Sequence, residues 1–468
     1  MCRLRIQLFF FLIICVFSLN AQDGFLVVNN ILYQGNHHTK EKVIFRELTF
    51  SIGDTIYLSE IEEHFKRSRL QILSTGLFNS ATLNLKNYSI THGKSDIEIL
   101  VEENWYLYPV PIFELADRNF NVWWNEQGKS LSRVNYGLRI SHYNFTGNRD
   151  PLKFKVHFGY TRKYELTYQR PYWMLDNKLG IGGSIFYSDN KEIAYKTEGN
   201  KSLFAQADDE RRLLSRFRVG PELKYRPDLN NYHALRLEYH HNQIDALVAE
   251  ELNPNYFLDG KEDLRFFYLE YDYSYDKRLL NYYPLGGYML FANIKKEGLG
   301  IFNDFNNLSI TLGFEKYFTI KEKLIFGTRN KGKTNLIRNQ IAFANNTGIG
   351  WDQDIVGGYE LYVMDGTDYF ISMNNVKFQI FDKNMRTASW LPRQFQKMNM
   401  SLFVRANFDF AYINEPTYKE TNSLNNRLIY GYGPAVDIIL FNNFLISFEY
   451  SFNDIGEQGL YLSNSFVF

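Results

Sequence analysis

The stretch ISFEYSF, residues 446–452, alternates apolar and polar side chains at every step. This period of two places the aliphatic and aromatic side chains on one face of an extended strand and the serines and the glutamate on the other. A helix does not explain such a period. The same alternation recurs at 153–160, 308–314 and 401–410. The segment from Trp105 to Phe468 is therefore predicted to be a series of β-strands.

Composition favours a membrane barrel over a soluble β-sandwich, which would also alternate. Aromatic residues make up 17% of the 468 residues, yet the mean hydropathy is only -0.34. An outer face that meets lipid between two aromatic girdles, around a polar lumen, explains both values. After the amino terminus no apolar run reaches the roughly 20 residues of a helical span. Lys+Arg and Asp+Glu both number 52, a balance that disfavours a nucleic-acid partner.

Residues 1–21 are predicted to be a secretory signal peptide. Two early arginines give a basic start, residues 8–19 form an apolar centre, and Ala21 is the small residue at the cleavage position. A retained membrane anchor is the alternative, but an uninterrupted apolar stretch of about ten residues is short for a bilayer. Both cysteines, Cys2 and Cys15, lie in this segment, so the mature chain is expected to contain no disulfide.

Residues 22–105 are predicted to form a separate α+β domain. Its elements follow in the order strand, helix, helix, strand, strand (βααββ), at 25–33, 40–49, 59–75, 81–88 and 96–103. This order, and the step Thr75-Gly76-Leu77-Phe78 from the second helix into the next strand, resemble a POTRA (polypeptide-transport-associated) domain. The resemblance implies a periplasmic domain whose open sheet edge receives an extended client. A small α+β spacer remains the alternative.

Turn signals divide residues 106–468 into sixteen predicted antiparallel strands. Their predicted ranges are 107–116, 132–145, 151–161, 163–173, 178–188, 213–226, 231–243, 264–276, 285–296, 306–318, 333–344, 368–382, 396–412, 427–440, 444–453 and 459–468. Short connections such as 146–150 alternate with long ones such as 189–212 and 244–263. The short connections are expected in the periplasm and the long ones outside the cell.

The segment Val356-Gly357-Gly358-Tyr359-Glu360 lies between the eleventh and twelfth predicted strands, and five strands follow it. In sequence and position it resembles the sixth-loop motif of the BamA-type superfamily, normally Val/Ile-Arg-Gly-Phe/Tyr. The resemblance implies a loop that folds into the barrel lumen, where the family's arginine pairs with acidic residues of the wall. Gly357 occupies that arginine position here.

Without the arginine, the loop is expected to be held by Tyr359, Glu360 or Asp365 and by close packing of its two glycines. An arginine introduced at position 357 is expected to find no acidic partner, and so to be an unpaired, partly buried charge. A tight surface turn is the alternative, since Gly357 and Gly358 permit positive φ.

The last eight residues resemble the carboxy-terminal β-signal of outer-membrane proteins, through Tyr461, Ser463, Phe466 and the terminal Phe468. Ser463 stands where the signal usually has glycine. With the motifs above, the chain resembles the BamA/TamA/FhaC group. This resemblance implies an outer-membrane barrel with one POTRA domain that inserts or translocates polypeptide clients. A single POTRA domain suggests an accessory or client-dedicated member, with possible periplasmic or lipoprotein partners.

Two other functions stay open, a passive porin-like channel and a barrel enzyme that acts on lipid or peptide. The adjacent His240 and His241 project to opposite faces of a strand, so they cannot form one metal site. The sequence contains no nucleophile elbow, zinc histidine pair or phosphate loop. We therefore expect no catalytic residue, no metal and no cofactor.

Overall fold

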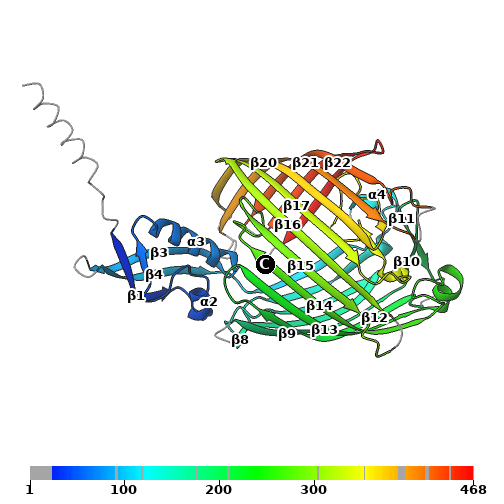
Figure 1. Cartoon of the computed structure of the whole chain (residues 1–468), viewed down its shortest axis with the longest axis horizontal. Coiled ribbons are helices and arrows are strands. Elements are labelled where there is room, and N and C mark those ends of the chain that lie inside the picture. Colours follow the sequence, from blue (N-terminus) through cyan, green and yellow to red (C-terminus); the bar gives the residue numbers. More distant parts are fainter. Residues whose placement is uncertain are drawn as a thin grey trace, which may run out of the picture. The chain divides into compact units, whose positions relative to one another are not determined.

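The computed structural model describes residues 24–466 except 90–92, 118–119, 175–177, 208–210, 303–304, 353, 388–395, 417–420 and 442–443. The predicted signal peptide and Phe468 lie outside these residues. The chain divides into two compact units between Glu103 and Asn104 (Figure 1). In the described part, no helix is long and apolar enough to cross a membrane.

The first unit is a four-stranded sheet with two helices. Its elements are β1 (Phe25–Gln34), α2 (Glu41–Phe45), β2 (Thr55–Tyr57), α3 (Ile61–Ser74), β3 (Phe78–Ser89) and β4 (Lys94–Glu103). The sheet order is β2-β1-β4-β3, and β1 and β4 are parallel. The predicted α+β fold is confirmed, with the short β2 as an additional strand between the helices. Buried Ile44 and Ile72 of the helices and Leu26 and Ile97 of the strands share its core.

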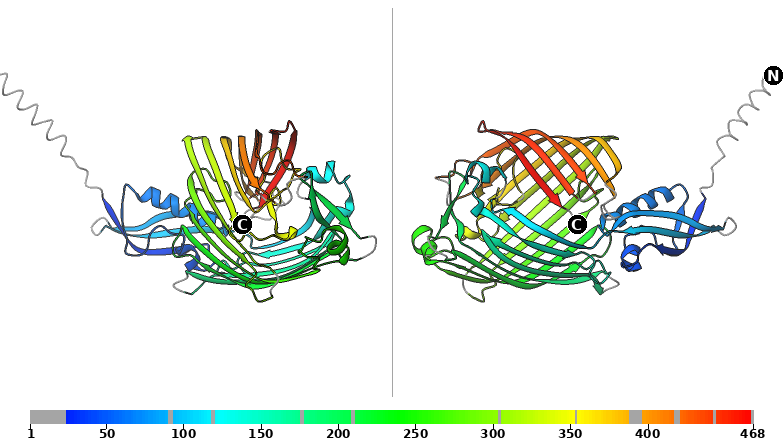
Figure 2. Two further views of the ribbon diagram at one scale, coloured as in Figure 1. Left: turned by 45° about the vertical axis from the view of Figure 1, so that its right-hand side comes forward. Right: turned by 180° about the vertical axis from the view of Figure 1, so that it is seen from behind.

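The second unit is a 16-stranded sheet in which every strand pairs antiparallel with its neighbours in chain order. Figures 1 and 2 show that the sheet curls into a barrel of oblique strands. The strands are β5 (Leu107–Leu115), β6 (Val134–His142), β7 (Leu152–Gly159), β8 (Thr161–Met174), β9 (Leu179–Asn190), β12 (Leu214–Tyr225), β13 (Asn231–Ile244), β14 (Asp263–Asp276), β15 (Gly287–Glu297), β16 (Asn307–Lys321), β17 (Leu324–Asn335), β20 (Asp368–Arg386), β21 (Lys397–Asn414), β22 (Leu428–Leu440), β23 (Phe444–Asn453) and β24 (Gln458–Phe466).

The predicted barrel of sixteen antiparallel strands is confirmed, but its eleventh strand was misplaced. The prediction at 333–344 is wrong because β17 begins at Leu324. Lys321 pairs with Leu324, so only Glu322 and Lys323 connect β16 to β17. This tight turn contains no glycine, asparagine or aspartate, so the usual hairpin signal is missing. A long connection was predicted in its place.

Strand β22 shows how the alternation divides the two faces of the barrel. The outward side chains are exposed and apolar, among them Leu428, Tyr430, Tyr432 and Val436. The side chains between them are buried inside the barrel, among them Ile429, Ala435 and Asp437. An apolar outer face around a partly ionic interior is the pattern of a transmembrane β-barrel.

Several long connections contain secondary structure that the periodicity did not predict. They are α4 (Phe120–Asn125), the 3-10 helix η1 (Leu131–Arg133), the hairpin β10 (Glu192–Glu198) and β11 (Lys201–Gln206), the π-helix η2 (Leu247–Leu252), the 3-10 helix η3 (Phe343–Asn345), β18 (Thr347–Ile349) and β19 (Met364–Asp365). Buried Leu213, Val248, Phe257 and Phe343 join three of these connections in one apolar cluster. The connections thus pack together at one end of the barrel.

Candidate functional site

Residues 336–367 join β17 to β20, and the part around residues 354–365 lies inside the ring of strands (Figure 2). Four of its motif residues, Val356 to Tyr359, are buried, and the side chains of Val356 and Tyr359 are 0% exposed. A tight surface turn would leave the tyrosine accessible to solvent. The burial therefore supports a lumenal loop.

Gly357 lies directly against the inner wall of the barrel. Its N–H donates to Asp409 Oδ2 of β21 at 3.3 Å. A Cβ at Gly431 of β22 would lie only 1.7 Å from the carbonyl oxygen of Gly357, so β22 can carry no side chain at this point. The loop backbone can approach the wall this closely because Gly431 has no Cβ.

The expectation that position 357 lacks acidic partners is wrong. A Cβ at Gly357 would lie 3.0 Å from Glu449 Oε1 and 3.5 Å from Asp409 Oδ2. The cation beside these carboxylates comes from β21, where Arg405 pairs with Asp437 at 2.8 Å and with Glu449 at 3.3 Å. The barrel wall therefore has acidic groups that face position 357. The arginine that pairs with acidic groups of this wall lies on strand β21 and not on the loop.

Gly358 requires glycine for two reasons. Its φ is +83°, in the left-handed region, and a Cβ would lie 2.9 Å from the backbone carbonyl carbon of Phe452. Its own carbonyl oxygen accepts a hydrogen bond from Asn453 Nδ2 at 2.7 Å. The loop is therefore joined to β23 by backbone contact as well as by hydrogen bonding.

Two tyrosines connect the loop to the turn between β23 and β24. The hydroxyl of Tyr359 donates to Asp454, and that of Tyr362 donates to Glu457 Oε1 at 2.8 Å. Burial and the nearby Asp454 carboxylate raise the pKa of Tyr359, so the phenol remains protonated and can donate. Around these bonds, Val356 and Tyr359 pack against lumenal apolar side chains that include Ile371 of β20.

The remaining predicted anchors, Glu360 and Asp365, are also enclosed. Burial raises the pKa of Glu360 to about 8 and that of Asp365 to about 6. Asp365 accepts a hydrogen bond from Trp351 Nε1 at 2.8 Å. The Glu360 carboxylate lies near Tyr461 of β24. The structure therefore brings together residues of the two motifs that the sequence analysis treated as separate.

Strand β24 contains the carboxy-terminal motif as far as Phe466. Tyr461 pairs with Glu449 on the lumenal side, whereas Leu460 and Leu462 are exposed on the outside. Ser463 is exposed, and Phe466 is the final residue of the strand, opposite Phe444. Tyr461 thus contacts the loop, which the sequence analysis did not foresee.

An asparagine cluster that the sequence analysis missed covers the loop from the outer hairpin. The backbone N–H of Asn200, between β10 and β11, donates to Asn422 Oδ1 at 2.8 Å, and its side chain donates to Asn425 Oδ1 at 2.9 Å. The N–H of Val363 in the loop donates to the Asn200 carbonyl at 2.8 Å. The available signal was the turn Gly199-Asn200 between two alternating runs.

This combination of barrel and internal loop agrees with the comparisons to known proteins. Residues 144–466 match the Omp85 superfamily domain. The chain belongs to the Omp85 superfamily. Among solved structures it is similar to BamA from Haemophilus ducreyi lacking POTRA domains 1–3, with 16% identity, a TM-score of 0.52 and coverage of 94% of this chain and 84% of that one.

A second similar structure is CdiB from Escherichia coli, with 11% identity, a TM-score of 0.55 and coverage of 95% of this chain and 76% of that one. At these identities the two likenesses establish the fold alone. No curated protein sequence matches the chain. As an Omp85 barrel, the protein resides in an outer membrane.

We expect Gly358→Val to abolish barrel assembly and Gly357→Arg to permit it. Valine at position 358 would clash with the Phe452 backbone and would also carry about 1–3 kcal/mol of backbone strain. Arginine at position 357 would instead lie near the carboxylates of Glu449 and Asp409. The heat-dependent mobility of the barrel on gels measures assembly. Gly456→Val is the control for strain alone, because Gly456 has φ +86° and no atom near its missing Cβ. Gly357→Gln controls for bulk, and failure of Gly357→Arg with success of Gly357→Gln would refute charge pairing.

Tyr359→Phe should destabilise the loop more than Tyr362→Phe. Each change removes one hydrogen bond to a carboxylate of the β23–β24 turn, but only Tyr359 is fully buried. We expect the first change to lower the free energy of unfolding by about 1.5–3 kcal/mol and the second by less than about 1 kcal/mol. Urea unfolding of the full chain in detergent provides the measurement. Equal effects would mean that the buried bond does not hold the loop.

Proposed function

We propose that this Omp85 barrel inserts or translocates polypeptides at the outer membrane, as an accessory or client-dedicated member with its POTRA domain in the periplasm. The observation that carries the proposal is the lumen loop, which is held against β21, β22 and β23 and brings Glu360 near Tyr461 of β24. The action would be non-covalent. The open edge of the POTRA sheet would receive the client, and the lumen loop would support the last strands of the barrel from inside.

The seam of the sheet provides a second support. The strand order ends at β5 on one side and at β24 on the other, and no ladder joins these two strands within the described ranges. The short helix α4 lies against β24. A seam of this kind can separate at a lower cost than a continuous ladder, because fewer backbone hydrogen bonds must be broken. A client strand could then pair with the exposed edge.

The occupied lumen argues against a passive porin. Besides the loop, the connection between β14 and β15 turns inward. Its Tyr283 is buried, packs against Phe403 with the rings tilted and their centres 4.7 Å apart, and donates to Asp437 Oδ2 at 2.7 Å. Side chains from both ends of the barrel therefore pack inside it. We expect small and irregular conductance in planar bilayers, where an open channel would conduct steadily.

The POTRA unit offers strand β3 as the edge for a client. In the order β2-β1-β4-β3, the two edges are β2, with 3 residues, and β3, with 12. Leu85 and Tyr88 of β3 are 41% and 45% exposed. A long edge with accessible apolar side chains suits β-augmentation, in which main-chain bonds bind an extended peptide whatever its sequence.

A photo-crosslinking amino acid in place of Leu85 tests this proposal in the full chain in cells. During export it should capture unfolded outer-membrane polypeptides, whereas the same group in place of Glu63, exposed on α3, should not. Mass spectrometry of the adducts identifies the client. Equal capture from both positions, or none from Leu85, would contradict a role for the β3 edge.

Single cysteines test the proposed topology, because Cys2 and Cys15 are the two cysteines of the sequence and both precede Gln22. Glu198→Cys in the β10–β11 hairpin should react with an impermeant maleimide on intact cells. Glu322→Cys, in the exposed turn after β16, should react only after the outer membrane is permeabilised. The reverse labelling pattern would mean that the barrel has the opposite orientation, with the POTRA domain outside the periplasm.

A further inference from the structure

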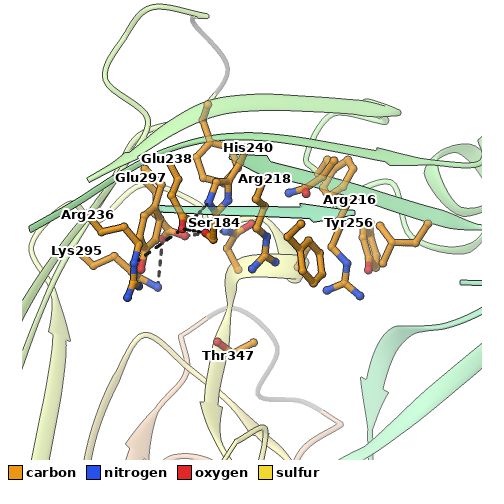
Figure 3. A pocket seen from close by; sticks show the side chains of 18 of the residues that line it. Ser184, Arg216, Arg218, Arg236, Glu238, His240, Tyr256, Lys295, Glu297 and Thr347 are labelled. Carbon is orange, nitrogen blue, oxygen red and sulfur yellow. Dashed lines mark hydrogen bonds and ion pairs between the residues drawn. The ribbon is translucent and has the colours of Figure 1, made fainter. Parts of the chain in front are cut away.

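A cavity of about 430 Å³ lies between the barrel wall and residues 344–347 of the lumen loop. Strands β8, β9 and β12 to β15 form most of its lining, and the connection after η2 adds Tyr256 and Phe257. The volume is that of a small-molecule site. Figure 3 shows its charged side chains gathered along one wall.

Most charges of this cavity are paired within the wall. Arg236 binds Glu270 at 2.6 Å and Glu222 at 3.1 Å. The three carboxylates that line the cavity also have cationic or histidine neighbours, in the pairs Glu297 with Lys295 at 3.7 Å, Glu238 with His240 at 2.8 Å and Glu165 with Lys163 at 2.7 Å. These groups satisfy one another without a ligand.

Arg216 and Arg218 are different. Neither forms an ion pair or a side-chain hydrogen bond with any residue in the described ranges, and the Nε atom of each is buried without an acceptor. They are two positions apart on β12, so both point to the same face of the strand, and Figure 3 shows both guanidinium groups directed into the open space that Thr347 faces. The Arg218 guanidinium also lies 5.1 Å from the ring centre of Phe186. Two unpaired, partly enclosed like charges are costly unless an anion neutralises them.

We propose that this lumenal cavity binds a phosphoryl group, such as that of a phosphate monoester. Two guanidinium groups carry two positive charges and more donors than one carboxylate can accept, since a single guanidinium already satisfies both carboxylate oxygens. A phosphate monoester carries about 1.5–2 negative charges at pH 7 and three acceptor oxygens. The hydroxyls of Ser184 and Thr347 and the rings of Tyr256 and Phe266 offer contacts for the rest of the molecule.

Thermal unfolding of the full chain in detergent tests the proposal. At constant ionic strength, phosphate and glycerol 3-phosphate should each raise the unfolding temperature in a saturable way, because a ligand of the folded state stabilises it. The double variant Arg216→Gln, Arg218→Gln should weaken binding by roughly tenfold or more. Arg265→Gln is the control for the same substitution outside the cavity, since Arg265 is exposed on β14 and pairs with Asp263. This control should keep the full shift.

A second variant separates binding from folding. Arg218→Met keeps apolar contact with Phe186 and removes one of the two like charges. Without added anion it should unfold at the same or a higher temperature than the wild type, and it should lose most of the phosphate response. A lower temperature would mean that the arginine serves the fold and would overturn the proposal.

Matched ligands define the chemistry and the source of the phosphoryl group. Succinate should give little shift, and a shift as large as that of phosphate would overturn the phosphoryl assignment. A response to glycerol 3-phosphate indicates a soluble ester, and a response confined to dihexanoyl phosphatidic acid indicates a lipid headgroup. No saturable shift with any phosphoryl ligand, or an undiminished shift in the double variant, would refute the site. None of these outcomes depends on the polypeptide-handling function.

Discussion

The close passage of the lumen loop over β22 is the constraint on which the rest of the barrel interior depends. Gly357 contacts the wall where Gly431 has no side chain, and one residue later Gly358 adopts a left-handed conformation against Phe452. These two steps turn the following tyrosines toward the β23–β24 turn. A side chain at Gly431 would hold the loop away from the wall. The hydrogen bonds that Gly358, Tyr359 and Tyr362 form with β23 and the β23–β24 turn would then be broken.

This geometry gives the ionic cluster of the wall an unusual composition. The carboxylates of Asp409 and Glu449 face the loop, but the arginine between the carboxylates, Arg405, is on β21. The loop contributes a backbone N–H in place of a charge. Neutral donors and apolar packing therefore hold the loop, and such contacts are less sensitive to salt than an exposed ion pair.

The barrel interior contains two regions with different charge balance. Around Arg405, Asp437 and Glu449 the cation and the carboxylates are mutually paired, and the surrounding loop fills the space. Around Arg216 and Arg218 a cavity remains, and neither guanidinium forms an ion pair with a described residue. The first region is built to hold the loop, while the second leaves donors available for a ligand.

Sequence alone determined the architecture, because the alternation of side chains depends only on local geometry. A period of two implies strands. Lipid outside the barrel favours apolar side chains on the outward face, and water inside favours polar side chains on the inward face. Strand β17 was misplaced because the turn at Glu322 and Lys323 contains none of the residues that usually mark a hairpin turn. The POTRA order and the position of the loop motif were likewise readable from local pattern and family resemblance.

Only the tertiary structure decided which lumenal residues meet. Arg405 and Glu449 were identifiable as polar-face residues of their strands, but their distance from Gly357 depends on the curvature of the barrel and on the path of the loop. Tyr461 reaches Glu360 for the same reason. Arg216 and Arg218 are two residues apart in the sequence, yet their lack of ion-pair partners follows from the inner surface of six strands and two connections. Proximity across a curved sheet is set by contacts between residues distant in the chain, and a local pattern contains no information about them.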